Sequence, residues 1–201
     1  MRQRITTALA ERRRHDDEAQ GRPKQAGFTL IELMVVLLII GILMAIAIPT
    51  YLSERNKAQN TAAQTTDRNA LTAVQAVYAA NNAYVVPPSS TATGFPAYMA
   101  TQEPALKWSA SAVSALNSVS VATFDSDNTT GTPQDQSIVL TAWTPTGGGT
   151  CWSVAQINYT GSSSGLSPGT YYNKAAAASG GCTAAAPTTT TGWGSSWATA
   201  G

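Results

Sequence analysis

One uninterrupted apolar stretch limits what this chain can fold into. Every residue from Leu33 to Ile48 is apolar or glycine, and between Phe28 and Ile48 the only charged residue is Glu32. As a helix rising about 1.5 Å per residue, residues 28–48 would extend about 31 Å, close to the hydrocarbon thickness of a bilayer. The stretch is apolar on all sides, which disfavours a helix lying in the membrane surface. We therefore expect residues 28–48 to span a membrane.

The charge distribution predicts the orientation of such a helix. The chain has a net charge of only +1, yet residues 1–27 hold seven of its twelve Lys and Arg and four of its eleven Asp and Glu. Basic residues accumulate on the cytoplasmic side of membrane helices, so we expect the N-terminus inside and the chain after residue 49 outside. Residues 28–201 hold five basic and seven acidic residues and lack the positive clusters of nucleic-acid-binding domains. No direct nucleic-acid binding is therefore expected.

Two ordinary interpretations of this N-terminus remain open at this point. A basic region, an apolar run and the tripeptide Ala45-Ile46-Ala47 together match the pattern of a cleaved secretory signal peptide. Against cleavage there, the basic region is long, the apolar run exceeds the usual length of about 7–15 residues, and a carboxylate lies inside the apolar block. The second interpretation is an uncleaved membrane anchor of no special kind.

The residues around the start of the apolar run carry a more specific resemblance. The segment from Gly27 to Leu33 reads GFTLIEL, follows a charged leader and precedes an apolar helix that contains Pro49. In these respects it resembles the class III signal of type IV prepilins. The resemblance implies that a prepilin peptidase removes residues 1–27 by cutting between Gly27 and Phe28 and then methylates the new N-terminal Phe28.

The resemblance also gives the carboxylate of Glu32 a role in assembly. An ionisable residue near a membrane helix is costly unless it is paired, and it is a functional candidate for that reason. Cleavage would leave Phe28 with an α-amino group of reference pKa about 8, which is largely cationic at neutral pH. In the family, this ammonium on a neighbouring subunit pairs with the carboxylate. The alternative is a local role, because the helix macrodipole favours negative charge in the first turns.

Beyond the apolar stretch, the helix is expected to continue and to become amphipathic. Pro49 removes a backbone donor, so we expect a kink or local unwinding there. Asn81, Asn82 and Pro87-Pro88 are stop signals, which predict one helix from about Phe28 to about Ala83. We divide the chain into the leader 1–27, the helical region 28–84 and a globular head 85–201. Helix-spaced apolar positions predict the face that packs on the head: Ala63, Ala70, Leu71, Val74, Val77 and Tyr78.

The head is expected to hold a small antiparallel sheet. Strand-like runs at 118–124, 137–144 and 150–159 are separated by stretches rich in Asp, Asn, Gly and Pro. Residues 85–118 are expected to form a connecting loop with a short helix around 109–116. The predicted fold class is α+β, the pilin fold, with the sheet covering the amphipathic half of the helix. The predicted inward face of the sheet carries Ile138, Leu140, Trp152 and Val154.

The two cysteines are expected to be bonded to each other. Cys151 and Cys182 both fall on the predicted exoplasmic side, where disulfides persist; two free buried thiols are the alternative. A C-terminal loop closed by a disulfide is also a layout that type IV pilins share. The charge-free tail after Cys182 is expected to be loop or disorder, anchored to the head by Trp193 and Trp197.

No catalytic constellation appears in the sequence, and no enzyme activity or cofactor is expected. The single histidine, His15, lies in the leader that processing would remove, which excludes a histidine-based triad from the mature chain. Asp125 and Asp127 are weak candidates for a calcium site, because their loop lacks the Gly and Glu positions of an EF-hand.

The expected function is that of a structural subunit of a type IV pilus. The precursor would cross the cytoplasmic membrane once, in contact with lipid, and then join a homopolymer outside the cell. The expected partners are further copies of the chain, the prepilin peptidase and the pilus assembly platform. Adhesion, twitching motility or DNA uptake would follow from the filament and its motors. Alternatives are a pseudopilin of a type II secretion or competence system, and a membrane-anchored or secreted binding protein with an ordinary signal.

Overall fold

The computed structural model describes residues 27–84, 94–124, 136–158 and 165–200. Contacts divide the chain into two compact units, residues 1–49 and residues 50–201. The weak calcium candidates Asp125 and Asp127 lie outside the described residues.

One long helix, α2 (Leu30–Asn81), forms close to the expected limits of 28 and 83. It ends where Asn82 adopts a left-handed conformation with φ of 56° and donates its N–H to the carbonyl of Tyr78 at 2.7 Å. Asparagine tolerates this conformation better than most residues, which explains why it ends the helix. The helix continues through Pro49 without interruption, so the expected local unwinding is not observed.

The N-terminal part of α2 is an apolar surface. From Phe28 to Leu52 the large apolar side chains are 42–87 % exposed. Among the described residues, α2 is the one helix long and apolar enough to cross a membrane, with a mean hydropathy of 3.0 in its most apolar window.

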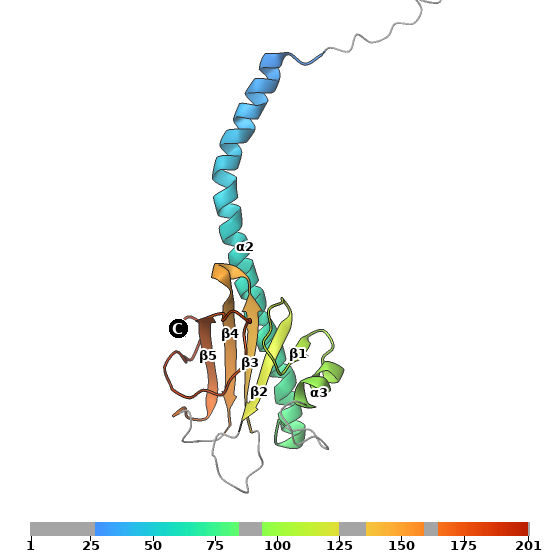
Figure 1. The fold of residues 1–201 in the computed structure, drawn as a ribbon, viewed down its shortest axis with the longest axis vertical. Coiled ribbons are helices and arrows are strands. Elements are labelled where there is room, and N and C mark those ends of the chain that lie inside the picture. Colours follow the sequence, from blue (N-terminus) through green and yellow to red (C-terminus); the bar gives the residue numbers. More distant parts are fainter. Residues whose placement is uncertain (1–26, 85–93, 125–135, 159–164, 201) are drawn as a thin grey trace, which may run out of the picture. The chain divides into compact units, whose positions relative to one another are not determined.

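The second unit contains a five-stranded sheet in the order β1-β2-β3-β4-β5 (Figure 1). Strands β2 to β5 form an antiparallel meander, and β1 pairs with β2 in parallel. The three expected strands are confirmed, and the sheet is mixed because of β1. The bounds are β1 (Lys107–Ser109), β2 (Ser118–Phe124), β3 (Ser137–Thr144), β4 (Thr150–Ile157) and β5 (Gly169–Ala176).

The expected helix of the connecting region was wrongly placed. The helix of this region is α3 (Gly94–Gln102), and residues 109–116 are not helical. Pro96 lies in the first turn of α3, where its missing N–H costs no helical hydrogen bond. Within 109–116, Val113 instead forms a β-bridge with Cys182, in which each backbone N–H donates to the other residue's carbonyl.

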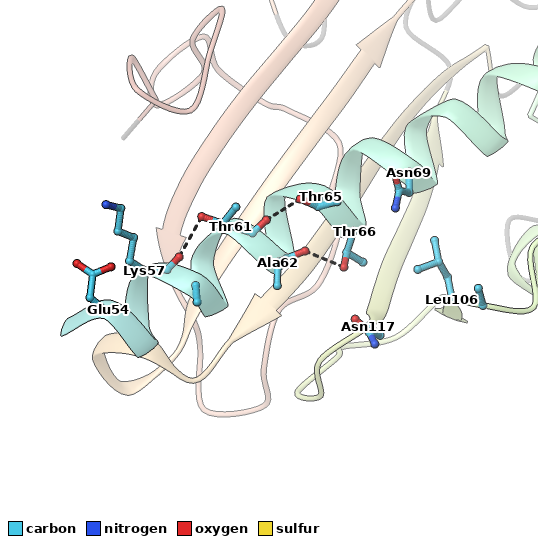
Figure 2. A pocket seen from close by; sticks show the side chains of 11 residues that line it. Glu54, Lys57, Thr61, Ala62, Thr65, Thr66, Asn69, Leu106 and Asn117 are labelled. Atoms are coloured by element: carbon cyan, nitrogen blue, oxygen red, sulfur yellow. Dashed lines mark hydrogen bonds between the residues drawn. The ribbon is translucent and has the colours of Figure 1, made fainter. Parts of the chain in front are cut away.

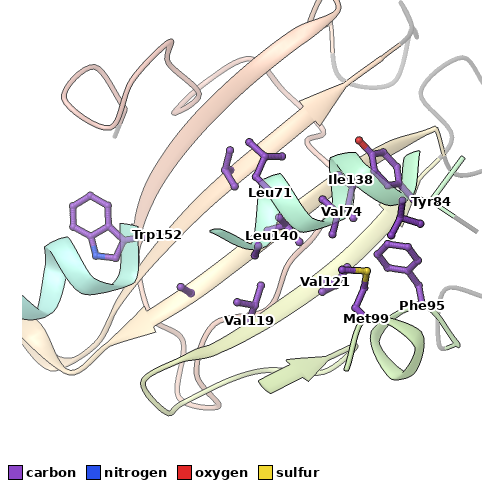
Figure 3. Close-up of a cluster of buried hydrophobic side chains, with 14 of the residues drawn as sticks. Leu71, Val74, Tyr84, Phe95, Met99, Val119, Val121, Ile138, Leu140 and Trp152 are labelled. Carbon is purple, nitrogen blue, oxygen red and sulfur yellow. The ribbon is translucent and has the colours of Figure 1, made fainter. Parts of the chain in front are cut away.

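The main core lies between α2 and one face of the sheet (Figure 3). The four side chains expected to face inward are buried there, which confirms the predicted face. A smaller cluster, which includes Val139, Ala155 and Ala184, covers the opposite face. Prominent members of the main core are Leu71, Val74, Tyr84, Phe95, Met99, Val119, Val121, Ile138, Leu140, Trp152 and Val154.

In its described part, residues 183–200, the C-terminal segment is a loop that packs against the sheet, in agreement with the expected loop and its anchoring through Trp193 and Trp197. The disulfide between Cys151 and Cys182 is confirmed, with 5.4 Å between the two Cα atoms. Beyond it, Gly194 exchanges backbone hydrogen bonds with Tyr172 at the free edge of β5. Trp197 then enters the main core. The segment therefore runs from one face of the sheet, past its edge, to the other face.

Candidate functional site

The residues at the expected cleavage point precede the helix. Gly27, Phe28 and Thr29 are not helical, and α2 begins at Leu30. Phe28 is 87 % exposed, and a side-chain carbon at Gly27 would meet no atom within 4 Å. This short non-helical stretch therefore presents an open peptide bond between Gly27 and Phe28.

Glu32 takes part in a reciprocal cap of α2. Its backbone N–H donates to Thr29 Oγ1 at 3.2 Å, while the backbone N–H and the hydroxyl of Thr29 each donate to Glu32 Oε2 at 3.4 Å. This is a capping box, in which residues three apart satisfy each other's free donors at the helix N-terminus. Sequence analysis missed it, although the spacing Thr-x-x-Glu before an apolar run is its signature.

The surface that follows the cap is chemically uniform. From Leu33 to Ile48 it offers only aliphatic, methionine and glycine surface, and Glu32 is the one charge between Phe28 and Pro49. Pro49 is itself exposed inside the continuous helix. Such a surface is stable in water only when something covers it, either lipid or protein.

No other expected chemistry is brought together in the described part of the chain. Within those residues there is no group of three His, Cys, Asp or Glu side chains that could hold a metal ion. The two cysteines are joined to each other and lie among the buried side chains of Val113 and its neighbours.

Asp67 is an unusual buried group that sequence analysis did not single out. It lies on the core-facing side of α2 with no exposed surface, and neither carboxylate oxygen has a hydrogen-bond partner among the described groups. Burial raises the pKa of Asp67 well above its ordinary value, and the nearby backbone of Ala142 lowers it by a smaller amount. The spacing of Asp67 along the helix predicts a buried position, because its neighbours on the same helix face are buried. Its charge predicts an exposed position.

The segment that leads into α2 and forms its first part matches a known protein-family model. The family model described as the prokaryotic N-terminal methylation motif matches residues 22–48. The chain therefore carries an N-terminal methylation motif. The match includes Gly27, Phe28 and Glu32, and it ends at Ile48, the last residue of the uninterrupted apolar run that begins at Leu33.

Several curated relatives share similarity with part of the chain. It is 67 % identical over 36 residues to fimbrial protein EcpB of Eikenella corrodens, which is 18 % of this chain and 23 % of that protein. It is 40 % identical over 62 residues to the type IV major pilin protein PilA of Myxococcus xanthus, which is 31 % of this chain and 28 % of that protein. The type II secretion system core protein G of Pseudomonas aeruginosa is 43 % identical over 61 residues, 30 % of this chain and 42 % of that protein.

These matches support the resemblance to type IV pilins, and each covers less than a third of this chain. The chain spans about a quarter of the length of the first pilin relatives it matches. No solved structure matches the chain. The pilin-like α+β fold is nevertheless confirmed by the long apolar helix, the small sheet and the disulfide that closes the C-terminal segment.

Proposed function

We propose that this chain is a structural subunit of a type IV pilus and that it acts by assembly rather than by catalysis. The observation that carries the proposal is the methylation motif, which runs directly into an exposed apolar helix surface. A precursor that leaves the membrane to polymerise needs two things. One is a motif that a peptidase recognises, and the other is an apolar surface that other copies can cover.

Processing comes first in this proposal. A prepilin peptidase cuts between Gly27 and Phe28 and methylates Phe28, which leaves residues 1–27 behind as the leader. The open, non-helical backbone on both sides of this bond supports its access to a protease. Until assembly, residues 28–48 lie in lipid with the head outside the cell, and the pilus assembly platform then draws the subunit into the filament.

Assembly replaces lipid around the apolar surface by other copies of the chain. Because lipid is as apolar as leucine, this exchange gains little from the hydrophobic effect and depends on packing and on polar pairs. In an apolar filament core, a lone carboxylate would be strongly destabilising, whereas a carboxylate beside an ammonium is tolerated. We infer that Glu32 pairs with the α-amino group of Phe28 on a neighbouring subunit.

The capping box shows how to test this role separately from local helix stability. Glu32→Gln keeps a side chain that can cap the helix but removes the charge, whereas Thr29→Ala removes the cap and keeps the charge. We expect Glu32→Gln to reduce filament yield severely and Thr29→Ala to reduce it little, with membrane insertion and cleavage normal in both. Glu103→Gln, which changes a Glu in the head, is the matched control. Normal filaments from Glu32→Gln would overturn the assembly role of this charge.

Mass spectrometry of the mature N-terminus separates the proposal from its competitors. Methylated Phe28 supports a processed pilin, Ile48 indicates ordinary signal cleavage, and an intact Met1 indicates a plain membrane anchor. Either of the last two results would overturn the proposal.

A second candidate function is that of a pseudopilin in a type II secretion system. The similarity to a core protein of such a system favours it, over 30 % of this chain. Immunogold labelling of cells distinguishes the two functions: a pilus subunit is found along long surface filaments, and a pseudopilin is not.

A further inference from the structure

The described end of the chain, residues 194–200, is attached to the sheet by few contacts, and we call it the terminal segment. Gly194 exchanges both backbone hydrogen bonds with Tyr172 in β5, at 2.8 and 2.9 Å, and Trp197 places its side chain in the main core. The ring of Trp197 packs edge-on against those of Trp152 and Tyr172, with centroid distances of 6.3 and 4.6 Å. One hydrogen-bonded pair and one indole therefore hold the terminal segment, which can open without breaking the strands of the sheet.

The core around Trp197 contains buried polar atoms that lack partners. In the part of the chain that the structure describes, six buried side-chain nitrogen or oxygen atoms have no hydrogen-bond partner. Four of them belong to three residues: both carboxyl oxygens of Asp67 and the indole Nε1 atoms of Trp152 and Trp197. Buried groups of these kinds normally find partners. The neighbouring Thr66 is also buried, yet it donates its hydroxyl to the carbonyl of Ala62 at 3.0 Å (Figure 2).

Contacts place Asp67 and the two tryptophans in one corner of the core. The carboxyl group of Asp67 lies near the backbone of Ala142 in β3, and Ala142 is the cross-strand partner of Trp152 in β4. The next residue along α2, Arg68, reaches Trp197, with its guanidinium 4.8 Å from the centroid of the ring. Trp197 is therefore the side chain with which the terminal segment closes the corner that holds the unpaired carboxyl group.

The charged groups around this corner do not compensate an ionised carboxylate. The strands β2, β3 and β4 and residues 183–200 carry no titratable side chain apart from the cysteines of the disulfide. Two exposed cations lie nearby, Arg68 on α2 and Lys174 on β5, and each stands over an indole ring. Strand β5 also supplies the phenol of Tyr172. Neither cation hydrogen-bonds to Asp67, so loss of its proton would leave a buried charge without a partner, which is costly.

We propose that Asp67 and Trp197 form a proton-dependent latch that holds the terminal segment closed. While the carboxyl group of Asp67 keeps its proton, the corner is uncharged and Trp197 stays in the core. When the proton passes to water, the carboxylate left behind has to be solvated. Withdrawal of the terminal segment exposes this corner at the cost of one pair of backbone hydrogen bonds and the packing of one indole. The latch lies within residues 50–201, and its action does not depend on assembly.

The direction of the pH dependence follows from the burial of the acid. Burial raises the pKa of Asp67 in the closed state, whereas exposure to water in the open state brings it back towards its ordinary value. Over the interval between the two values, opening releases a proton. The equilibrium constant for opening therefore rises with pH, by about tenfold per pH unit at most.

Hydrogen exchange of the full chain in detergent, read by NMR at the amides of Tyr172 and Gly194, tests the latch. Protection factors remove the pH dependence that exchange has in an unfolded chain. At both amides we expect lower protection than at Leu140 in the central strand, and a fall of at least about tenfold between pH 4 and pH 8. Protection equal to that of Leu140, or protection independent of pH, would overturn the proposal. This comparison within the unmodified chain does not depend on the folding of any variant.

Two variants assign the effect to the proton of Asp67. Asp67→Asn cannot ionise at this position, so its terminal segment is expected to keep about the same protection from pH 4 to pH 8. Glu54→Gln, an exposed change on the same helix, is the matched control and is expected to retain the fall seen in the unmodified chain. A fall in Asp67→Asn as large as in the unmodified chain would overturn the latch.

Discussion

Replacing Asp67 by asparagine should change how the stability of the head, taken with the part of α2 that packs on it (residues 50–201), depends on pH. The carboxyl group has no exposed surface and no hydrogen-bond partner among the described groups. The adjacent cation does not compensate it, because the guanidinium of Arg68 lies over the ring of Trp197, 4.8 Å from its centroid. A buried carboxylate without a partner is costly, so the folded head favours the protonated acid and the pKa is raised.

The sign of the pH dependence follows from this raised pKa. In the unfolded chain Asp67 loses its proton near the ordinary value of about 3.9, whereas the folded head keeps it to higher pH. Over the interval between the two values, unfolding releases a proton, and the free energy of unfolding therefore falls as pH rises. The contribution of this one group has a limiting slope of about 1.4 kcal/mol per pH unit. It is fully present below pH of about 4 and is lost as pH approaches the folded pKa.

Thermal unfolding of the mature chain in detergent, followed by tryptophan fluorescence between pH 4 and pH 8, measures this effect. Titration of all other groups is common to the variant and the unmodified chain, so the difference between their profiles isolates Asp67. We expect Asp67→Asn to match the unmodified chain at the acidic end and to exceed it progressively as pH rises. Glu54→Gln, an exposed change on the same helix, should leave the profile unchanged. Parallel profiles for Asp67→Asn and the unmodified chain would refute the reasoning.

Two further predictions concern the C-terminal segment. Cys182→Ser should lower the free energy of unfolding by about 3–4 kcal/mol, because the disulfide closes a loop over a sequence separation of 31. Limited proteolysis of this variant should cut first within 177–181, and unchanged protease resistance would count against the prediction. Trp197→Ala should lower the free energy of unfolding by about 3–5 kcal/mol, because Trp197 is only 8 % exposed and packs on Trp152 and Tyr172. Trp193→Ala, which removes a half-buried side chain outside the main core, should lower it less when both variants are unfolded with denaturant.

The sequence predicted the parts of the fold whose signal is local and strong. The strands β2, β3 and β4 are rich in β-branched residues, are bounded by turn-forming stretches and are mostly buried. Strand β5 was missed because it lies at the sheet edge, where its residues are only half-buried or exposed. Strand β1 has three residues, and its parallel pairing with β2 depends on a partner register that no local pattern encodes.

The same distinction between local and long-range signals applies to the candidate site. The run GFTLIEL and the spacing of Thr29 and Glu32 can be found in the sequence, because a signal motif and a helix cap both depend on residues that are close together in the chain. The groove beside Ala58, Thr61 and Ala62 of α2 could not be predicted, since it forms only when Leu106 and Asn117 fold against α2. The burial of Asp67 could not be predicted either, because its position on the helix and its charge point to opposite environments.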